Sequence, residues 1–148
     1  MQKKMDLILE KGTELGISEF IFFFSKNSSI KKISKNKVER MKNITISAIK
    51  QCKRLDLPNI SIVKDIKKVK LQKNSFFGDI RNNATFLLDI LEKPIKNSIL
   101  FFIGPEKGFS KEEMSFLEKQ AKGVSLSNNT LRSETAAISF SSIISHIT

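Results

Sequence analysis

The sequence has little of what disulfide, metal and hydrolytic sites are built from. Its 148 residues include one cysteine, Cys52, and one histidine, His146. A lone cysteine forms no internal disulfide, and no Cys/His cluster is available for zinc, so a secreted disulfide scaffold is excluded and no metal site is predicted. Cys52 lies on the apolar face of a predicted helix, where a small core residue is favoured over a nucleophile. The position of His146 near the C-terminus argues against a Ser/His/Asp triad.

Long apolar runs are also missing. The longest, Phe20–Phe24 and Ile99–Ile103, are far shorter than the ~20 residues that cross a bilayer. Met1 leads into an amphipathic segment without the apolar core of a signal peptide. We therefore expect a soluble, cytoplasmic protein without a membrane partner.

Basic residues are abundant and unevenly distributed. The net charge is +11, and residues 26–73 hold 15 Lys and Arg against 3 acidic residues, while the remainder of the chain is close to neutral. Such a block favours a polyanionic partner, with nucleic acid as the first to consider. A lysine-rich solvated surface is the alternative interpretation.

Hydrophobic periodicity predicts an α/β fold, a mostly parallel sheet with helices on both faces, because strands and helices alternate along the chain. Ser110 and Glu113 predict a capping box, and Gly123 is taken as the end of that helix. The region 64–83 is poorly patterned apart from a short helix, and a turn is expected around Pro94. The predicted helices cover residues 5–15, 38–52, 66–70, 110–121 and 133–147, and the predicted strands 19–25, 60–63, 84–90, 98–103 and 124–126.

Loops that follow predicted strands are the places where ligands bind in open parallel sheets. Two such loops, Ile103–Ser110 and Leu126–Ala136, each lead into a helix. Neither matches a P-loop or a dinucleotide-binding fingerprint. From composition alone, an ordinary strand-to-helix turn remains the alternative for each. Glu112 and Glu113 are interpreted as charges at a helix N-terminus rather than as an acid/base pair.

Four segments in order along the chain resemble the RsmE-type methyltransferases, which methylate N3 of a uridine in small-subunit (16S) ribosomal RNA. The most specific are Ile103–Ser110, with the letters IGPEKGFS, and Leu131–Ala136, with the letters LRSETA. Lys11–Ile17 and Gln51–Arg54, followed by Pro58, match earlier motifs of that family. The resemblance spans essentially the whole chain.

The resemblance implies a SPOUT-type fold with a C-terminal trefoil knot, S-adenosylmethionine as cofactor and a homodimer. It implies a cofactor site at Leu88, Ile103, Gly104, Pro105, Glu106, Leu126, Ser127 and Leu131. Arg132 and Glu134 are the implied catalytic pair. The basic face of the helix 38–52 is expected to bind ribosomal RNA, with Lys37, Arg40, Lys50, Lys53 and Arg54 as candidate contacts.

The implied chemistry is compatible with these residue types. Uridine N3 becomes nucleophilic as negative charge develops on the ring oxygens, and a guanidinium such as that of Arg132 would stabilise this charge or hold the adjacent phosphate. Glu134 would accept the proton or orient Arg132, and the orienting role is favoured.

Several positions depart from the family pattern. Lys107 stands where glycine is usual, Lys50 where glutamate is usual, and Ser127–Asn129 replaces a Gly-x-Arg segment. We expect residues 1–148 to be the methyltransferase domain without the N-terminal RNA-binding barrel of full-length members, so the basic third would carry more of the RNA docking. The alternatives are a non-catalytic RNA-binding remnant of the same fold and a SPOUT methyltransferase acting on another RNA.

Overall fold

The computed structural model describes residues 2–81, 83–91 and 97–147 and confirms the α/β architecture. The turn expected around Pro94 lies outside the described residues. The helices are α1 (Gln2–Glu14), α2 (Lys35–Cys52), α3 (Leu87–Ile90), α4 (Lys111–Gln120), α5 (Ser133–Ser145) and the 3₁₀ turn η1 (Ile66–Lys68). The strands are β1 (Glu19–Phe23), β2 (Asn59–Val63), β3 (Asn74–Gly78), β4 (Thr85–Phe86), β5 (Ile99–Phe102) and β6 (Lys122–Ser125).

The strands form two hydrogen-bonded groups rather than the single sheet expected. Strands β1 and β2 pair in one group, and the other has the order β4-β6-β3-β5. Every strand pairing among the described residues is parallel, which confirms the expected direction. The carboxyl ends of paired strands therefore lie at a common edge, and the loops that leave them meet there.

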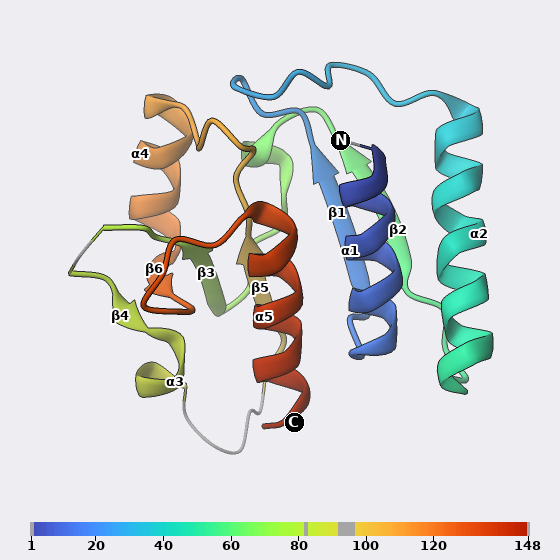
Figure 1. Ribbon diagram of the computed structural model, residues 1–148. Coiled ribbons are helices and arrows are strands. Elements are labelled where there is room, and N and C mark those ends of the chain that lie inside the picture. Colours follow the sequence, from blue (N-terminus) through green and yellow to red (C-terminus); the bar gives the residue numbers. More distant parts are fainter. Residues whose placement is uncertain (1, 82, 92–96, 148) are drawn as a thin grey trace.

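Helices cover both faces of the strands, as expected. Along β1, Phe20 and Phe22 pack on the side of α1 and α2, while Ile21 and Phe23 face a separate core that includes Leu117 of α4. This alternation is the period of two that a strand imposes on its side chains. In Figure 1, α5, α1 and α2 lie side by side on one face, with α1 between its two neighbours.

The strand β3 was not predicted, although it lies at the centre of the larger group between β5 and β6. Its side chains Ser75, Phe76 and Phe77 are buried, but the run is short and polar segments flank it, so periodicity gives no signal. The strand expected over 84–90 is divided into β4 and the single helical turn α3. Gly123 belongs to β6 rather than to the end of α4, which closes at Ala121 in an extended conformation.

The later strand β6 is inserted between β3 and β4. Gly78 of β3 and Thr85 of β4 are both register partners of Val124 of β6. The connection that leaves β3 at Asp79 must therefore cross β6. A Cβ atom at Gly123 would lie 2.6 Å from Asp79 Oδ2, so the absence of a side chain at Gly123 makes this crossing possible.

Among the described residues, no helix has the length and apolar character that a membrane span requires.

Candidate functional site

The β5–α4 loop, residues 103–110, is a tight turn that leads into a capped helix. The backbone N–H of Gly108 donates to the carbonyl of Pro105 at 2.8 Å, and Gly108 has a φ of 73°. That left-handed conformation favours glycine. Ser110 caps α4, and its hydroxyl accepts from the backbone N–H of Glu113 at 3.2 Å. The predicted capping box is therefore present.

Glu113 also fastens the end of β1 to the start of α4. The residue is only 6% exposed. Its carboxylate accepts hydrogen bonds from the Ser25 hydroxyl at 2.9 Å, the Lys26 backbone N–H at 3.0 Å and the Ser110 backbone N–H at 2.7 Å. These donors satisfy the buried carboxylate. They assign Glu113 to holding the loop, in agreement with its interpretation as a helix N-terminal charge.

The β6–α5 loop, residues 126–132, meets the β5–α4 loop directly. The hydroxyl of Ser133, the first residue of α5, donates to the backbone carbonyl of Gly104 at 3.0 Å. The structure therefore brings together the two segments that the sequence singled out. Arg132 lies at the N-cap of α5. Its exposed side chain makes no hydrogen bond or ion pair with any residue that the structure describes.

A cluster of charges surrounds this junction. Lys4 of α1 forms a close ion pair with Glu106 and lies 3.7 Å from Glu134 Oε2. The hydrogen bond from Lys4 holds the pKa of Glu106 below its usual value, and the charges of Lys4 and Arg132 act in the same direction. The same hydrogen bond raises the pKa of Lys4. Both groups are therefore charged near neutral pH.

Glu134 is placed differently from the sequence expectation. Its Oε2 is buried and has no hydrogen-bond partner among the described residues, and the cation beside it is Lys4 rather than Arg132. The favoured orienting contact between Glu134 and Arg132 is not formed within the described part of the chain. A buried oxygen without a donor is costly unless a ligand supplies one.

The turn at Ser127 is closed by its own hydroxyls. Ser125 Oγ donates to the Ser127 carbonyl at 2.8 Å, and the backbone N–H of Asn129 donates to Ser127 Oγ at 3.2 Å. Leu126 packs against the core that contains Phe140. Serine in place of glycine is therefore accommodated here by local hydrogen bonds.

Leu88 does not lie at a strand end. It is in the single turn α3 and is 55% exposed, whereas its neighbour Leu87 is buried. The strand predicted over residues 84–90 ends at Phe86, because the buried Leu87 begins a helical turn immediately after β4.

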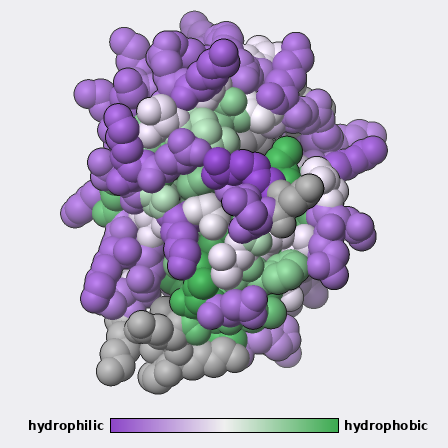
Figure 2. Space-filling view, turned by 90° about the vertical axis from the view of Figure 1, so that its left-hand side faces the viewer, coloured by the Kyte–Doolittle hydropathy of each residue, from purple (hydrophilic) through white to green (hydrophobic). Residues whose placement is uncertain are grey.

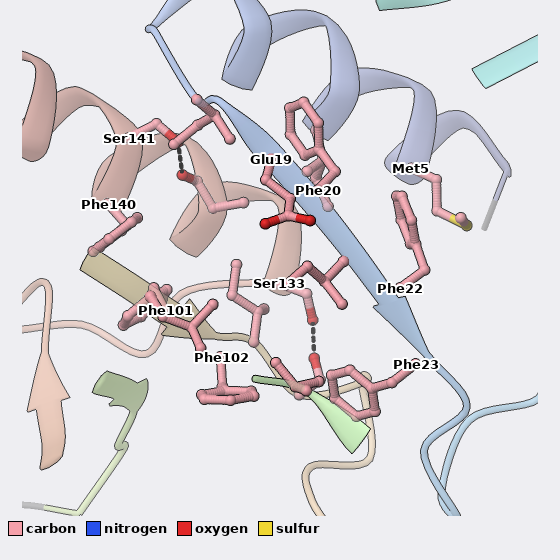
Figure 3. A pocket seen from close by; sticks show the side chains of 18 of the residues that line it. Met5, Glu19, Phe20, Phe22, Phe23, Phe101, Phe102, Ser133, Phe140 and Ser141 are labelled. Carbon is pink, nitrogen blue, oxygen red and sulfur yellow. Dashed lines mark hydrogen bonds between the residues drawn. The ribbon is translucent and has the colours of Figure 1, made fainter. Parts of the chain in front are cut away.

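A cleft of about 1390 Å³ separates β1 from β5 and ends at the β5–α4 loop. In Figure 3, Phe20, Phe22 and Phe23 of β1 line one side of it, and Phe101 and Phe140 line the other. The rings of Phe101 and Phe140 stack with centroids 4.3 Å apart. The three expected contacts of the β6–α5 loop, Leu126, Ser127 and Leu131, do not line the cleft. We therefore place the candidate site at the junction of the two loops, where the Ser133–Gly104 contact joins them, and not in the body of the cleft.

Arg54 has a structural role that the sequence did not indicate. Its Nη1 donates to the carbonyls of Thr13 at 2.8 Å and Ile17 at 2.9 Å, and its Nη2 pairs with Asp56. Its side chain is 14% exposed. The guanidinium thus holds the turn between α1 and β1 instead of facing a partner.

The other basic candidates of α2 remain at the surface to different degrees. Arg40 pairs with Asp6 at 2.7 Å, and Lys37 is half-buried, while Lys50 and Lys53 are exposed at the C-terminal end of the helix. The residues that sequence reasoning missed are Lys4, Ser25 and Asn27. Lys4 is 102 positions from Glu106, so no local pattern would have joined them.

Comparisons with known proteins point to one family. A family model described as an RNA methyltransferase domain matches residues 1–145. The ribosomal RNA small subunit methyltransferase E of Aquifex aeolicus is 36% identical over 147 residues, which is 96% of this chain and 62% of that protein.

Solved structures give the same result. A methyltransferase from Legionella pneumophila, in complex with its bound cofactor SAM, has a TM-score of 0.84 and 26% identity, covering 97% of this chain and 61% of that one. A ribosomal RNA small subunit methyltransferase E from Neisseria gonorrhoeae, bound to S-adenosyl methionine, has a TM-score of 0.83 and 25% identity over 97% of this chain and 61% of that one. The chain thus spans about three fifths of the length of these relatives. Because the family model covers nearly all of it, this chain belongs to the RNA methyltransferase domain family.

Proposed function

We propose that the chain is the catalytic domain of an S-adenosylmethionine-dependent methyltransferase that modifies N3 of a uridine in small-subunit ribosomal RNA. The observation that carries the proposal is the 3.0 Å hydrogen bond from Ser133 to Gly104. It joins the two motif loops into one site and places Arg132 at its margin. The names of the relatives from Aquifex aeolicus and Neisseria gonorrhoeae support the ribosomal substrate.

The residues at the loop junction fit S-adenosylmethionine. Half-buried Ile103 and Leu126 offer apolar surface for an adenine ring. The orphaned Oε2 of Glu134 offers an acceptor for an ammonium or hydroxyl group. We assign the cofactor contacts to Ile103–Glu106 and Leu126–Leu131. The bound cofactor would supply a methyl group activated on a sulfonium.

In this proposal, Arg132 stabilises the negative charge that develops on the uracil ring. Because its guanidinium is exposed and has no partner among the described residues, its donors are available to a substrate. A fixed cation beside the developing oxyanion lowers the barrier more than it tightens ground-state binding. Glu134 is held against Lys4, so we propose that it positions the start of α5 and receives a donor from the cofactor or the substrate.

The order of the larger sheet supports the expected trefoil knot. The insertion of β6 between β3 and β4 requires the chain to cross itself, and Gly123 lies beside Asp79, the first residue after β3. We propose that this crossing belongs to the knot, that residues 1–148 form one methyltransferase domain, and that the domain acts as a homodimer. Modification of ribosomal RNA would take place in the cytoplasm.

The experiment is a transfer assay with S-adenosylmethionine carrying a tritiated methyl group and small ribosomal subunits from a strain that lacks the modification. The expected result is saturable label in 16S RNA, with mass spectrometry of the digested RNA identifying 3-methyluridine. Label at another position or base would refute the N3 assignment, whereas transfer to transfer RNA alone would favour the alternative SPOUT substrate.

A non-catalytic remnant is the second candidate. The observation that favours it is the Ser127 turn, which is closed by its own hydroxyls where the family pattern has glycine. A remnant binds RNA but neither binds the cofactor nor transfers label, so the same assay separates the two.

A further inference from the structure

The turn that follows β1, residues 25–31, is fastened to the β5–α4 loop. Asn27 Nδ2 donates to the carbonyl of Gly108 at 3.1 Å. Ser25 and Lys26 both donate to Glu113, and the Lys26 ammonium pairs with Glu112 at 2.5 Å. This basic turn is thus held in a fixed position beside the candidate site.

Lys31 is a positioned cation in this turn. Its Nζ donates to the carbonyls of Ser25 at 3.0 Å and Lys26 at 2.8 Å. An ammonium has three donors, so one stays directed away from these carbonyls. The residue is exposed, and no carboxylate pairs with it among the described residues. Its charge is therefore both ordered and available.

A second group of exposed lysines follows the end of β2, at the same edge of the strands. Phe23 of β1 pairs with Val63 of β2, so the two strands end side by side. Lys64, Lys67 and Lys68 follow directly and are exposed. The charge of Lys67 reaches Glu112, whose pKa is lowered first by its hydrogen bond to Lys26 and further by Lys67. We call Lys31, Lys64, Lys67 and Lys68 the carboxyl-edge lysines.

The basic residues of α2 occupy a different place. Helix α2 begins at the carboxyl edge and runs back along the strands, so its C-terminal end lies at the opposite end of the molecule (Figure 1). Lys50 and Lys53 are at that far end. Hydrophilic side chains cover the upper end of the face shown in Figure 2.

We propose that the carboxyl-edge lysines form the phosphate-binding surface that holds RNA beside the β5–α4 loop. The inference rests on the proposed function and proposes RNA contacts at a different place from the sequence-based candidates on α2. Single-stranded RNA on either side of a target base carries one phosphate per nucleotide, and lysine ammonium groups bind phosphates as point charges. Cations at this edge lie near the β5–α4 loop, since Lys26 pairs with Glu112 at the start of α4 and the charge of Lys67 reaches the same carboxylate.

The test compares two triple variants with the same change in charge. One removes three of the four carboxyl-edge lysines (K64Q/K67Q/K68Q), and the control removes three charges from the outer surface of α2 and its C-cap (K42Q/K50Q/K53N). Asparagine is chosen at Lys53 because its φ is 61°. Each is titrated with a fluorescently labelled, uridine-containing single-stranded RNA across a salt series. Circular dichroism spectra establish that both variants are folded.

The edge variant is expected to bind about tenfold more weakly at physiological salt, with the slope of log Kd against log salt concentration reduced by about 2. The control is expected to stay within about threefold of the parent. Lys31→Gln alone should reduce the slope by about 0.7. Equal losses in both triple variants, or a larger loss in the control, would overturn the inference.

Two further measurements distinguish a failure of this inference from a failure of the proposed function. Calorimetry with S-adenosylmethionine tests the proposed function independently, because neither triple variant changes the loop junction. If the protein binds the cofactor and the edge variant binds RNA as tightly as the parent, the inference is refuted and the proposed function is not. Poly-L-glutamate serves as a competitor: if it displaces RNA at equal charge concentration, the surface recognises an acidic protein and the inference is wrong.

Discussion

The hydroxyl of Ser133 donates to the backbone carbonyl of Gly104 at 3.0 Å, across 29 positions of sequence. This bond joins the N-terminus of α5 to the turn that leaves β5. The site depends on the relative position of these loops, so the bond is a direct means of testing their coupling.

Replacing Ser133 with alanine should weaken binding of S-adenosylmethionine by about fivefold to tenfold, since a net hydrogen bond is worth about 1 kcal/mol. Isothermal titration calorimetry measures the change. Ser139→Ala is the matched control, because Ser139 is half-buried on the same helix and makes no hydrogen bond through its side chain in the described structure. Equal affinities for the two variants would show that the Ser133 bond does not hold the site.

Arg132→Ala should lower the rate of methyl transfer by about a hundredfold or more, because one oxyanion-stabilising donor contributes about that much. Cofactor affinity should change little, since Arg132 is exposed and makes no hydrogen bond or ion pair with the residues that the structure describes. Single-turnover transfer to small ribosomal subunits gives the rate, and Arg132→Lys should recover part of it. Full transfer by Arg132→Ala would remove the residue from the mechanism.

Gly123→Ala should destabilise the fold by about 1–3 kcal/mol, the usual cost of overpacking. The added Cβ would lie 2.6 Å from Asp79 Oδ2 and 2.9 Å from Phe77 Cζ. Gly78→Ala is the control on the adjacent strand, because its Cβ would meet Phe101 at an ordinary 3.5 Å. Urea denaturation measures both. Similar stabilities would contradict the close crossing of β6.

The crossing also predicts a dependence of stability on pH. The hydrogen bonds from Arg81 hold the pKa of Asp79 below its usual value. A carboxylate with a lowered folded-state pKa stabilises the protein above its unfolded-state pKa, and this contribution is lost as the pH falls through the folded value. The urea concentration at the unfolding midpoint should therefore decrease as the pH is lowered below about 4. In Asp79→Asn this decrease should be smaller. Parallel pH profiles would show that Asp79 does not contribute.

Arg54→Met should lower the free energy of unfolding by about 2 kcal/mol, because two backbone carbonyls lose a charged donor. At temperatures where the variant is folded, RNA affinity should remain near that of the parent. Lys50→Met, on the exposed side of α2, should change stability by less than about 0.5 kcal/mol. A large loss of RNA affinity without a loss of stability would return Arg54 to the RNA surface.

Local patterns predicted the elements whose signal lies within a few neighbouring residues. The Ser110–Glu113 capping box is an example. The short strand β3 was missed because its burial depends on β5 and β6, which come later in the chain. Gly123 was interpreted as a helix end because the close approach of Asp79 is visible only once the strands are ordered.

The parts of the site that lie within short sequence motifs were predictable. The loops around Gly104 and Arg132 were identified from their letters, and the structure places them in contact. The role of Lys4 was not predictable, since it depends on α1 lying against loops about a hundred residues further along the chain. Arg54 was predicted to bind RNA. The two carbonyls that it contacts are 41 and 37 positions away in the sequence, so the pattern within the helix gives no sign of them.

The central claim is that the two contacting loops form a cofactor site in this chain. Isothermal titration of the folded protein with S-adenosylmethionine tests it most directly. The account predicts saturable binding with one cofactor per chain, weakened by Ser133→Ala and competed by S-adenosylhomocysteine. A folded protein that binds RNA but shows no saturable heat with S-adenosylmethionine would contradict the account.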